Sequence, residues 1–324
     1  MNRKLLPTLV TALVLVGLFV GGAGLYPGFG SVRVVANLIS DNAVLGIVAL
    51  GMTLVILSGG IDLSVGAVVA CSSIVMATLI ERGHFHPAVA TLIVLVLGGG
   101  FGWVQGGLIH RYGLPAFLVT LGGMFFARGM AFVVSMESMG IGDRSFRLAQ
   151  DFSWELGWKA SISSAGLVFM GLFGLGLWVM HWTVFGRNIY AVGGSGESAA
   201  LMGLPLGGTR KSVYAASGFC GALGGVATTL YTSSGNPAMG SGLELDAIAA
   251  VVIGGTLLSG GVGYLWGTTL GVLIFGTIQS VLIFDGRLNS SWLRIAIGTL
   301  LLVFILLQRI LAIGVTRGGK GTSE

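Results

Sequence analysis

Long apolar segments follow one another along this chain, and they constrain its fold more than any other feature of the sequence. A helix of roughly 20 apolar residues spans a bilayer, and in lipid the backbone polar groups must be paired within helices or a closed barrel. Only 9% of the residues are charged, against roughly 25% in soluble proteins. The sequence therefore predicts an all-α polytopic membrane protein with about ten transmembrane helices, at 5–25, 36–57, 64–81, 88–109, 115–135, 163–184, 211–232, 245–258, 264–284 and 291–312.

The 57 glycines are scattered within these apolar segments instead of being collected in the connections. Lipid gives little hydrophobic drive for helix association, so close packing through small residues holds membrane helices together. We therefore interpret residues 1–324 as a single transmembrane domain that ends in a polar cytoplasmic tail at 313–324. The amino end resembles a signal sequence, but its apolar stretch is long and we expect it to remain as the first span.

The distribution of basic residues predicts the orientation, because short cytoplasmic loops carry an excess of Lys and Arg. With the amino end inside, the outer loops and span ends receive Arg33, Arg82, Arg287 and Arg294, and the connection 136–162 lies outside. The inner face receives the larger group: Arg3, Lys4, Arg111, Arg187, Arg210, Lys211, Arg309, Arg317 and Lys320. An even number of spans places both termini in the cytoplasm.

The segment 186–204 is the one polar excursion on the inner side that has the features of a short capped helix. Ser195 can accept hydrogen bonds from free backbone amides, and Glu197 lies where the positive end of the helix dipole favours an anion. Gly203 and Pro205 then supply a C-terminal stop. The segment predicts a cytoplasmic docking helix, and an ordinary amphipathic helix resting on the lipid headgroups is the alternative.

Asp62 and Ser64 stand beside a predicted helix break at Gly59-Gly60. A carboxylate at membrane depth costs about 2.5–3.5 kcal/mol on insertion scales, so it needs a partner. One interpretation is that Asp62 or Ser64 caps the free amides of the third span. The other is that Asp62 is a ligand for an ion or a substrate.

Four further polar residues lie within or at the ends of predicted spans. Glu244 and Asp246 open the eighth span from the outer side, where acids stabilise a helix N-terminus and where a solute would enter. Gln105 and Arg128 lie inside spans and are expected to bridge helices.

One short motif occurs twice. Leu57-Ser58-Gly59-Gly60 recurs as Leu258-Ser259-Gly260-Gly261, with six complete predicted spans between the two copies. Chance in a glycine-rich sequence is a fair competitor to an internal repeat. In either case both turns are expected to break helices near the inner surface.

The sequence contains no arrangement that supports catalysis, a metal site or a bound cofactor. Cys71 and Cys220 both lie inside apolar segments, which signals neither disulfides nor metal ligands. Gly314 to Lys320 nearly matches a phosphate-binding loop, but Gly321 stands where Ser or Thr should hold magnesium. A secondary transporter would need a coupling-ion site with paired intramembrane carboxylates, whereas the acids here cluster at span ends.

Three separated motifs, in order, resemble the permease subunits of bacterial ABC importers for sugars, the ribose and galactose branch related to branched-chain amino acid permeases. They are Gly60–Gly66; Gly186-Arg187 with Tyr190–Gly194 and Ala199-Ala200; and Glu244–Ala249 running into Val252–Thr256 and Leu258–Gly261. At Ser195 the family usually has Asn, which is an equally good cap. Arg33-Val34, Asp41-Asn42-Ala43, Met124-Phe125-Phe126, Phe284-Asp285-Gly286 and Ser291-Trp292 resemble most closely a permease subunit of the galactofuranose importer.

The resemblance implies a type II-like importer fold and an assembly in which ATP and magnesium are bound by other chains. The expected partners are a second permease subunit, identical or a sister chain, two cytoplasmic ATPase subunits and a periplasmic sugar-binding protein. It also implies that 186–204 seats in a groove of the ATPase through Gly186, Arg187, Tyr190, Gly193, Gly194, Ser195, Glu197, Ala199 and Ala200. Other sugars, or branched-chain amino acids, are alternative solutes within the family.

Overall fold

The computed structural model describes residues 6–157, 160–286 and 291–318, with side chains from 8 to 306 in those ranges. Arg3, Lys4, Arg287 and Lys320 lie outside the described residues. The helices are α1 (Leu6–Leu25), α2 (Val32–Asp41), α3 (Ala43–Leu57), α4 (Val65–Glu81), α5 (Pro87–Tyr112), α6 (Ala116–Val134), α7 (Arg144–Asp151), α8 (Ser164–Trp182), α9 (Val184–Gly194), α10 (Gly196–Leu201), α11 (Leu206–Thr232), α12 (Leu243–Ile253), α13 (Leu265–Asp285) and α14 (Ser291–Gly318).

Every predicted span corresponds to a helix in the described chain, but fewer of these helices are long enough to cross a membrane alone. Six are, namely α1, α5, α6, α8, α11 and α13, and a seventh span is possible if α2 and α3, bent by 57° at their junction, count as one. The predicted eighth span is α12, which has 11 residues and is therefore only about 16 Å long. The structure supports a multi-pass helical protein without supporting a count of ten.

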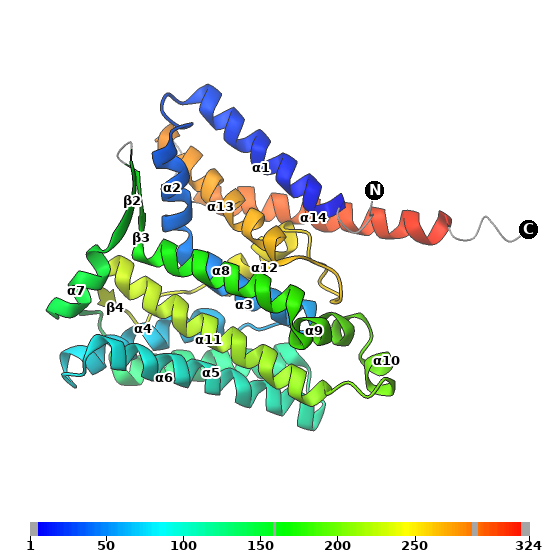
Figure 1. The fold of residues 1–324 in the computed structure, drawn as a ribbon, viewed down its shortest axis with the longest axis horizontal. Coiled ribbons are helices and arrows are strands. Elements are labelled where there is room, and N and C mark those ends of the chain that lie inside the picture. The colour runs from blue at the N-terminus through cyan, green and yellow to red at the C-terminus, as the bar shows by residue number, and fades with distance from the viewer. Residues whose placement is uncertain (1–5, 158–159, 287–290, 319–324) are drawn as a thin grey trace, which may run out of the picture.

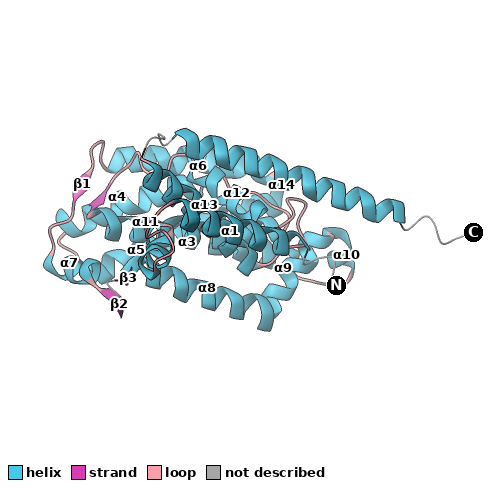
Figure 2. Ribbon diagram, turned by 90° about the horizontal axis from the view of Figure 1, so that it is seen from above, coloured by secondary structure: helices cyan, strands magenta, loops and turns pink. Residues whose placement is uncertain are grey.

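Four short strands lie in the connections. β1 (Met139–Gly140) pairs antiparallel with β4 (Ser234–Gly235), and β2 (Ser153–Gly157) pairs antiparallel with β3 (Ala160–Ser163). Together with α7 these strands gather at one end of the molecule, whereas α9 and α10 lie at the opposite end (Figures 1 and 2). The separation agrees with the prediction that 136–162 and 186–204 face opposite sides of the membrane.

The interior is built around α11, which packs along α5, α3 and α4 (Figure 1). Glycines allow this closeness: a Cβ on Gly218 would overlap the carbonyl oxygen of Gly98, and one on Gly102 would overlap that of Tyr214. Small residues at a helix crossing let two backbones touch. The glycines of these spans therefore pack helices, as their distribution predicted.

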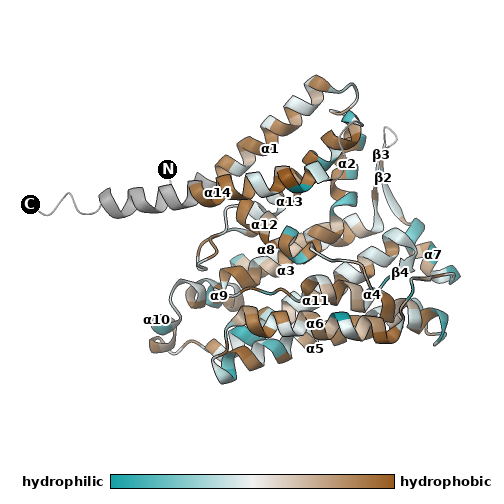
Figure 3. Ribbon diagram, turned by 180° about the vertical axis from the view of Figure 1, so that it is seen from behind, coloured by the Kyte–Doolittle hydropathy of each residue, from teal (hydrophilic) through white to brown (hydrophobic). Residues whose placement is uncertain are grey.

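Many large apolar side chains are exposed on the outside of the bundle, as expected for surfaces in contact with lipid, and the helices are largely hydrophobic in composition (Figure 3). Leu13 on α1 and Val133 on α6 are 72% and 79% exposed. The buried residues of α3, α4 and α12 are nearly all apolar, with few hydroxyls among them. The molecule thus has an apolar exterior and a close-packed interior, and its polar side chains gather at breaks and ends.

α14 continues to Gly318, so the predicted tail at 313–324 begins inside a helix. Residues 319–324 lie outside the described chain. The near-match to a phosphate-binding loop, from Gly314 to Lys320, therefore starts within a helix. A phosphate-binding loop instead precedes its helix, following a strand.

Candidate coupling site and broken helices

The segment 186–204 forms two helices instead of one. Thr183 caps α9 by accepting from the Gly186 amide at 3.2 Å. Ser195 then ends α9 with its own amide bonded to the Ala191 carbonyl, and its hydroxyl caps α10 by accepting from the Ser198 amide at 3.2 Å. The predicted capped helix is α10, and a separate helix, α9, precedes it and ends at Ser195, which is extended with φ of −161°.

The two helices present different faces to the rest of the chain. In α9 Gly186, Ile189 and Val192 are buried and Arg187 is exposed. The Tyr190 hydroxyl donates to the Gly263 carbonyl at 3.0 Å, and burial raises the pKa of Tyr190 to about 12. Tyr190 is therefore a neutral phenol at cellular pH, held in place by the α12–α13 connection.

The exposed face of α10 contains the predicted contact residues Glu197 and Ala200 but not Ala199. Ala199 is fully buried against this chain, so it cannot contact an ATPase without unpacking. Glu197 and Ala200 are exposed, and beside them Leu201 and Met202 are 90% and 69% exposed. Gly203 turns the chain with φ of +75°. Ala200–Met202 thus form a short exposed apolar surface at the end of α10.

Three segments that are remote in the sequence meet at the end of α9. Their contact residues are Gly59, Gly193, Gly260 and Gly261. We call these four residues the glycine junction. The Gly261 amide donates to the Leu57 carbonyl at 2.9 Å, and a Cβ on Gly193 would overlap that same oxygen. Gly59, Gly260 and Gly261 have φ of +82°, +84° and +73°. Both copies of the repeated motif are helix breaks, as expected, and the fold brings them together.

Asp62 lies in the non-helical segment 60–64 between α3 and α4 and is 1% exposed. Its Oδ1 accepts from the amide and the hydroxyl of Ser64 at 2.9 and 2.6 Å, and its Oδ2 accepts from the Ser217 hydroxyl of α11 at 2.7 Å. Gln105 of α5 donates from Nε2 to the Ser64 hydroxyl at 3.2 Å. The network fastens the segment to α11 and α5.

This geometry divides the predicted cap between its two candidates. Ser64 occupies the N-cap position of α4 without a cap bond from its own side chain, whereas Asp62 accepts from the Ser64 amide, the first amide of the predicted span. Asp62 and Ser64 are already engaged with each other, with Ser217 and with Gln105. Ser217 was absent from the sequence prediction, because one serine in a glycine-rich span belongs to no motif.

A second polar group lies between α6 and α12. Arg128 donates from Nη1 to the carbonyl of Pro237 at 3.0 Å and to that of Met239, which holds the 236–242 connection against α6. Glu244 accepts from the Gly242 amide at 3.3 Å, its Oε2 is buried without a partner among the described residues, and its charge acts on Arg128. Asp246 is exposed on α12.

The position of Glu244 shows where α12 begins relative to α4. A Cβ on Gly66 would overlap Glu244 Oε2, and Gly66 lies in the first turn of α4. The preceding connection runs back along α4, since the Asn236 amide donates to the Ser73 hydroxyl at 3.3 Å. α12 therefore begins partway along the bundle and not at its outer end, which corrects the predicted position of Glu244 and Asp246.

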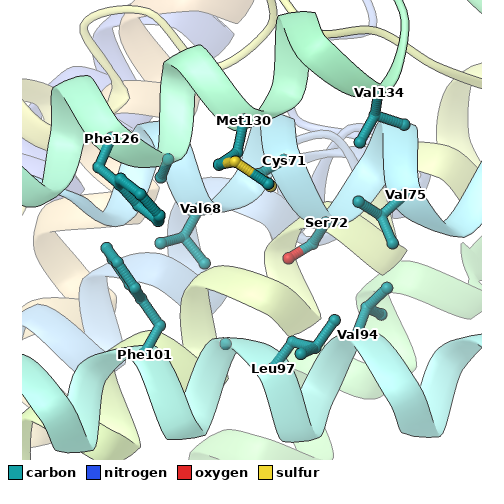
Figure 4. Close-up of a pocket in the computed structure, with 12 residues that line it drawn as sticks. Val68, Cys71, Ser72, Val75, Val94, Leu97, Phe101, Phe126, Met130 and Val134 are labelled. Carbon is teal, nitrogen blue, oxygen red and sulfur yellow. The ribbon is translucent and has the colours of Figure 1, made fainter.

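The described part of the chain has two pockets of note. One, of about 220 Å³, lies between α4, α5 and α6 and is lined by apolar side chains, with Ser72 and Cys71 at its wall (Figure 4). It offers too few hydrogen-bond partners for a polyhydroxyl solute. The other, of about 270 Å³, lies beside the Ser58–Gly60 break and is lined by Arg210 and Tyr214. Neither contains a cluster of metal-ligating side chains among the described residues.

Comparison with known proteins identifies the family. Residues 34–306 match the family described as branched-chain amino acid transport system / permease component. The inner membrane ABC transporter permease protein YjfF of Escherichia coli is 45% identical over 95% of this chain and 93% of its own length. The fructose import permease protein FruG of Bifidobacterium longum is 37% identical over 97% and 94% of the two chains, and the ribose import permease protein RbsC of Bacillus subtilis is 36% identical over 88% and 87%.

No solved structure significantly matches the chain. The family match covers most of the sequence, and the three relatives align over nearly their full lengths. This chain therefore belongs to the permease component family of ABC transporters.

Proposed function

We propose that this permease is the membrane-spanning subunit of an ATP-driven importer that moves a sugar from the periplasm to the cytoplasm. The proposal rests chiefly on the full-length similarity to permeases whose names specify fructose or ribose import. The three sequence motifs that resemble sugar permeases also coincide with the breaks and the short helices of the fold. They fall on the segment 60–64, on α9 and α10, and on α12 with its following connection. ATP and magnesium belong to partner subunits in this proposal.

The proposed partners are a second permease subunit, two ATPase subunits and a periplasmic binding protein. The apolar outer faces of the bundle can meet lipid and the second permease (Figure 3). In the proposed orientation both termini are cytoplasmic. α1 begins and α14 ends toward the end of the molecule that carries α9 and α10, which supports placing the termini on the same side as those helices (Figure 1).

We propose that α10 docks into the ATPase through Ala200, Leu201 and Met202, with Glu197 beside them. Exposed apolar side chains at the tip of a cytoplasmic segment are typical anchors for a protein groove. Ala199 is left out of the contact because it is buried in this chain. Gly186, Arg187, Tyr190, Gly193, Gly194 and Ser195 then shape and support the docking helix from α9.

The docking test compares two exposed leucines at opposite ends of the molecule. Leu201→Glu places a charge that must be desolvated in the contact, and we expect it to weaken ATPase binding by roughly 2 kcal/mol, about thirtyfold. Leu148 on α7 is 68% exposed, and Leu148→Glu is its matched control. Co-purification of the ATPase with each variant measures the difference. Equal binding by the two variants would remove α10 from the interface.

Galactofuranose is the proposed solute, because the residues that distinguish branches of the family resemble a galactofuranose importer most closely. Proteoliposomes that contain the assembled importer and its binding protein should accumulate labelled galactose, which is partly furanose in water, ahead of ribose, fructose or leucine. Preferred accumulation of ribose, fructose or leucine would replace galactofuranose as the proposed solute. It would leave the proposal of an ATP-driven importer unchanged. Accumulation driven by an ion gradient in the absence of ATP would instead favour a secondary transporter.

A further inference from the structure

We infer that the glycine junction passes displacement of the docking helices to two broken membrane helices at once. The inference rests on the proposed docking of α10 and adds the route by which its movement reaches the membrane. The positioning residues are Gly193 at the end of α9 and Gly59, Gly260 and Gly261 at the two breaks.

The first observation is that the junction is a contact between backbones. The Leu57 carbonyl belongs to the last turn of α3, where a helix leaves carbonyl oxygens without an internal partner. Its partner is the Gly261 amide, at 2.9 Å, from the connection between α12 and α13. The end of one broken helix is therefore held by the break of the other, across two hundred residues of sequence.

The second observation is that α9 presses on this pair without intervening side chains. A Cβ on Gly193 would lie 2.7 Å from the Gly261 amide nitrogen and would overlap the Leu57 oxygen. A Cβ on Gly260 would lie 2.9 Å from both the Gly193 carbonyl and Gly59 Cα. Close-packed backbone transmits a shift directly, because no rotamer can change to absorb it.

The third observation is that α9 is attached to the second break at another point. The Tyr190 hydroxyl donates to the Gly263 carbonyl at 3.0 Å, one helical turn before Gly193. Two attachments, one through a side chain and one through the backbone, fix the orientation of α9 on the 257–263 connection. α9 and both breaks therefore behave as one unit.

The fourth observation concerns what lies beyond each break. The segment 60–64 carries Asp62, which is bonded to Ser217 of α11, and leads into α4. The 257–263 connection joins α12, with Glu244 in its first turn, to α13. Displacement of α9 consequently moves both polar groups of the bundle together.

The first experiment compares adjacent glycines in the assembled transporter. Gly193→Ala inserts a methyl group into the junction, whereas a Cβ on Gly194 would meet nothing within 4 Å. With ATPase subunits bound, we expect Gly193→Ala to lower sugar transported per ATP hydrolysed by about tenfold, within the range of allosteric coupling free energies, and Gly194→Ala to lower it far less. Equal losses in the two variants, or no loss in either, would overturn the inference.

A second measurement keeps the inference testable if Gly193→Ala fails to fold. Ser198 and Ser259 are exposed on α10 and on the second break, and Ser138 is exposed at the opposite end of the molecule. Spin labels at Ser198→Cys and Ser259→Cys, with Cys71→Ala and Cys220→Ala and one labelled copy per complex, report their separation. With ATP and vanadate this separation should stay unchanged, while that between Ser198→Cys and Ser138→Cys should change.

Each outcome of the label experiment decides something. A change between Ser198→Cys and Ser259→Cys would show that α10 and the second break do not move together, which would overturn the inference. No change in either pair would show that no displacement passes through it. Failure of the ATPase to bind the unlabelled wild-type chain would instead overturn the docking proposal, which keeps the two failures distinguishable.

Discussion

The α5–α11 crossing and the glycine junction both depend on glycine, but for different physical reasons. At the crossing Gly98, Gly102 and Gly218 have ordinary helical backbones, and what they provide is the absence of a side chain between two helices. At the junction Gly59, Gly260 and Gly261 have positive φ, and what they provide is a backbone conformation that other residues rarely adopt. The comparison teaches that composition alone does not distinguish a packing glycine from a conformational one.

The largest expected effect comes from cutting the connection between these two regions. Asp62 links the segment after the junction to Ser217 on α11. Asp62→Ala would leave the Ser64 amide and the Ser217 hydroxyl without their acceptor, at about 1–3 kcal/mol for each group, and would leave the Ser64 hydroxyl only its 3.3 Å contact with Gln105 Oε1. We expect a steep fall in thermal stability in detergent, measured by tryptophan fluorescence. Asp62→Asn, which retains one acceptor oxygen, is the matched control, and equal stability of the two variants would contradict the anchoring role.

The crossing itself should be sensitive to volume alone. Gly218→Ala would drive a methyl group into the Gly98 carbonyl, and overpacking of this kind costs typically about 1–3 kcal/mol. Loss of folded protein in membrane extracts, together with a lower unfolding temperature, would measure it. Gly122→Ala on α6, where a Cβ meets nothing within 4 Å, should have no such effect. If Gly218→Ala has the same unfolding temperature as the wild type, the crossing is looser than its geometry implies.

At Gly59 the junction should be sensitive to backbone conformation more than to volume. A Cβ on Gly59 would have 3.9 Å of space, yet φ of +82° costs an L-residue about 1–2 kcal/mol. Gly59→Ala should therefore destabilise the protein, and Gly59→Asn should do so less because Asn tolerates this region better. The order of the two unfolding temperatures is the measurement. An equal or reversed order would indicate a steric rather than a conformational requirement.

The smallest effect is expected at a glycine that neither packs against another helix nor has a positive φ. Gly100 lies on α5 with an exposed surface and open space around its Cβ position. Gly100→Ala should stabilise the helix by roughly 0.5–1 kcal/mol, because alanine loses less backbone entropy on folding than glycine. A small rise in unfolding temperature would support this. A fall would mean that Gly100 is covered in the assembled transporter, for example by a second permease.

The sequence by itself determined the class of protein and the places where its helices lie. Apolar length and low charge required a helical membrane protein, and the glycine pairs marked the breaks after α3 and α12. Ser195 and Glu197 were correctly assigned to the start of a helix, because capping depends on a few neighbouring residues. These features are local, so a linear pattern contains them.

Only the tertiary structure decided which residues those local features meet. Ala199 is buried and Leu201 exposed because α10 packs on the bundle, a fact that neither residue's immediate neighbours specify. Asp62 finds its partner 155 residues away in Ser217, and the two copies of the repeated motif touch through Leu57 and Gly261. Such contacts depend on how apolar helices of similar composition cross, and many crossings bury similar apolar area. The contacts of α9 with both breaks are therefore visible only in three dimensions.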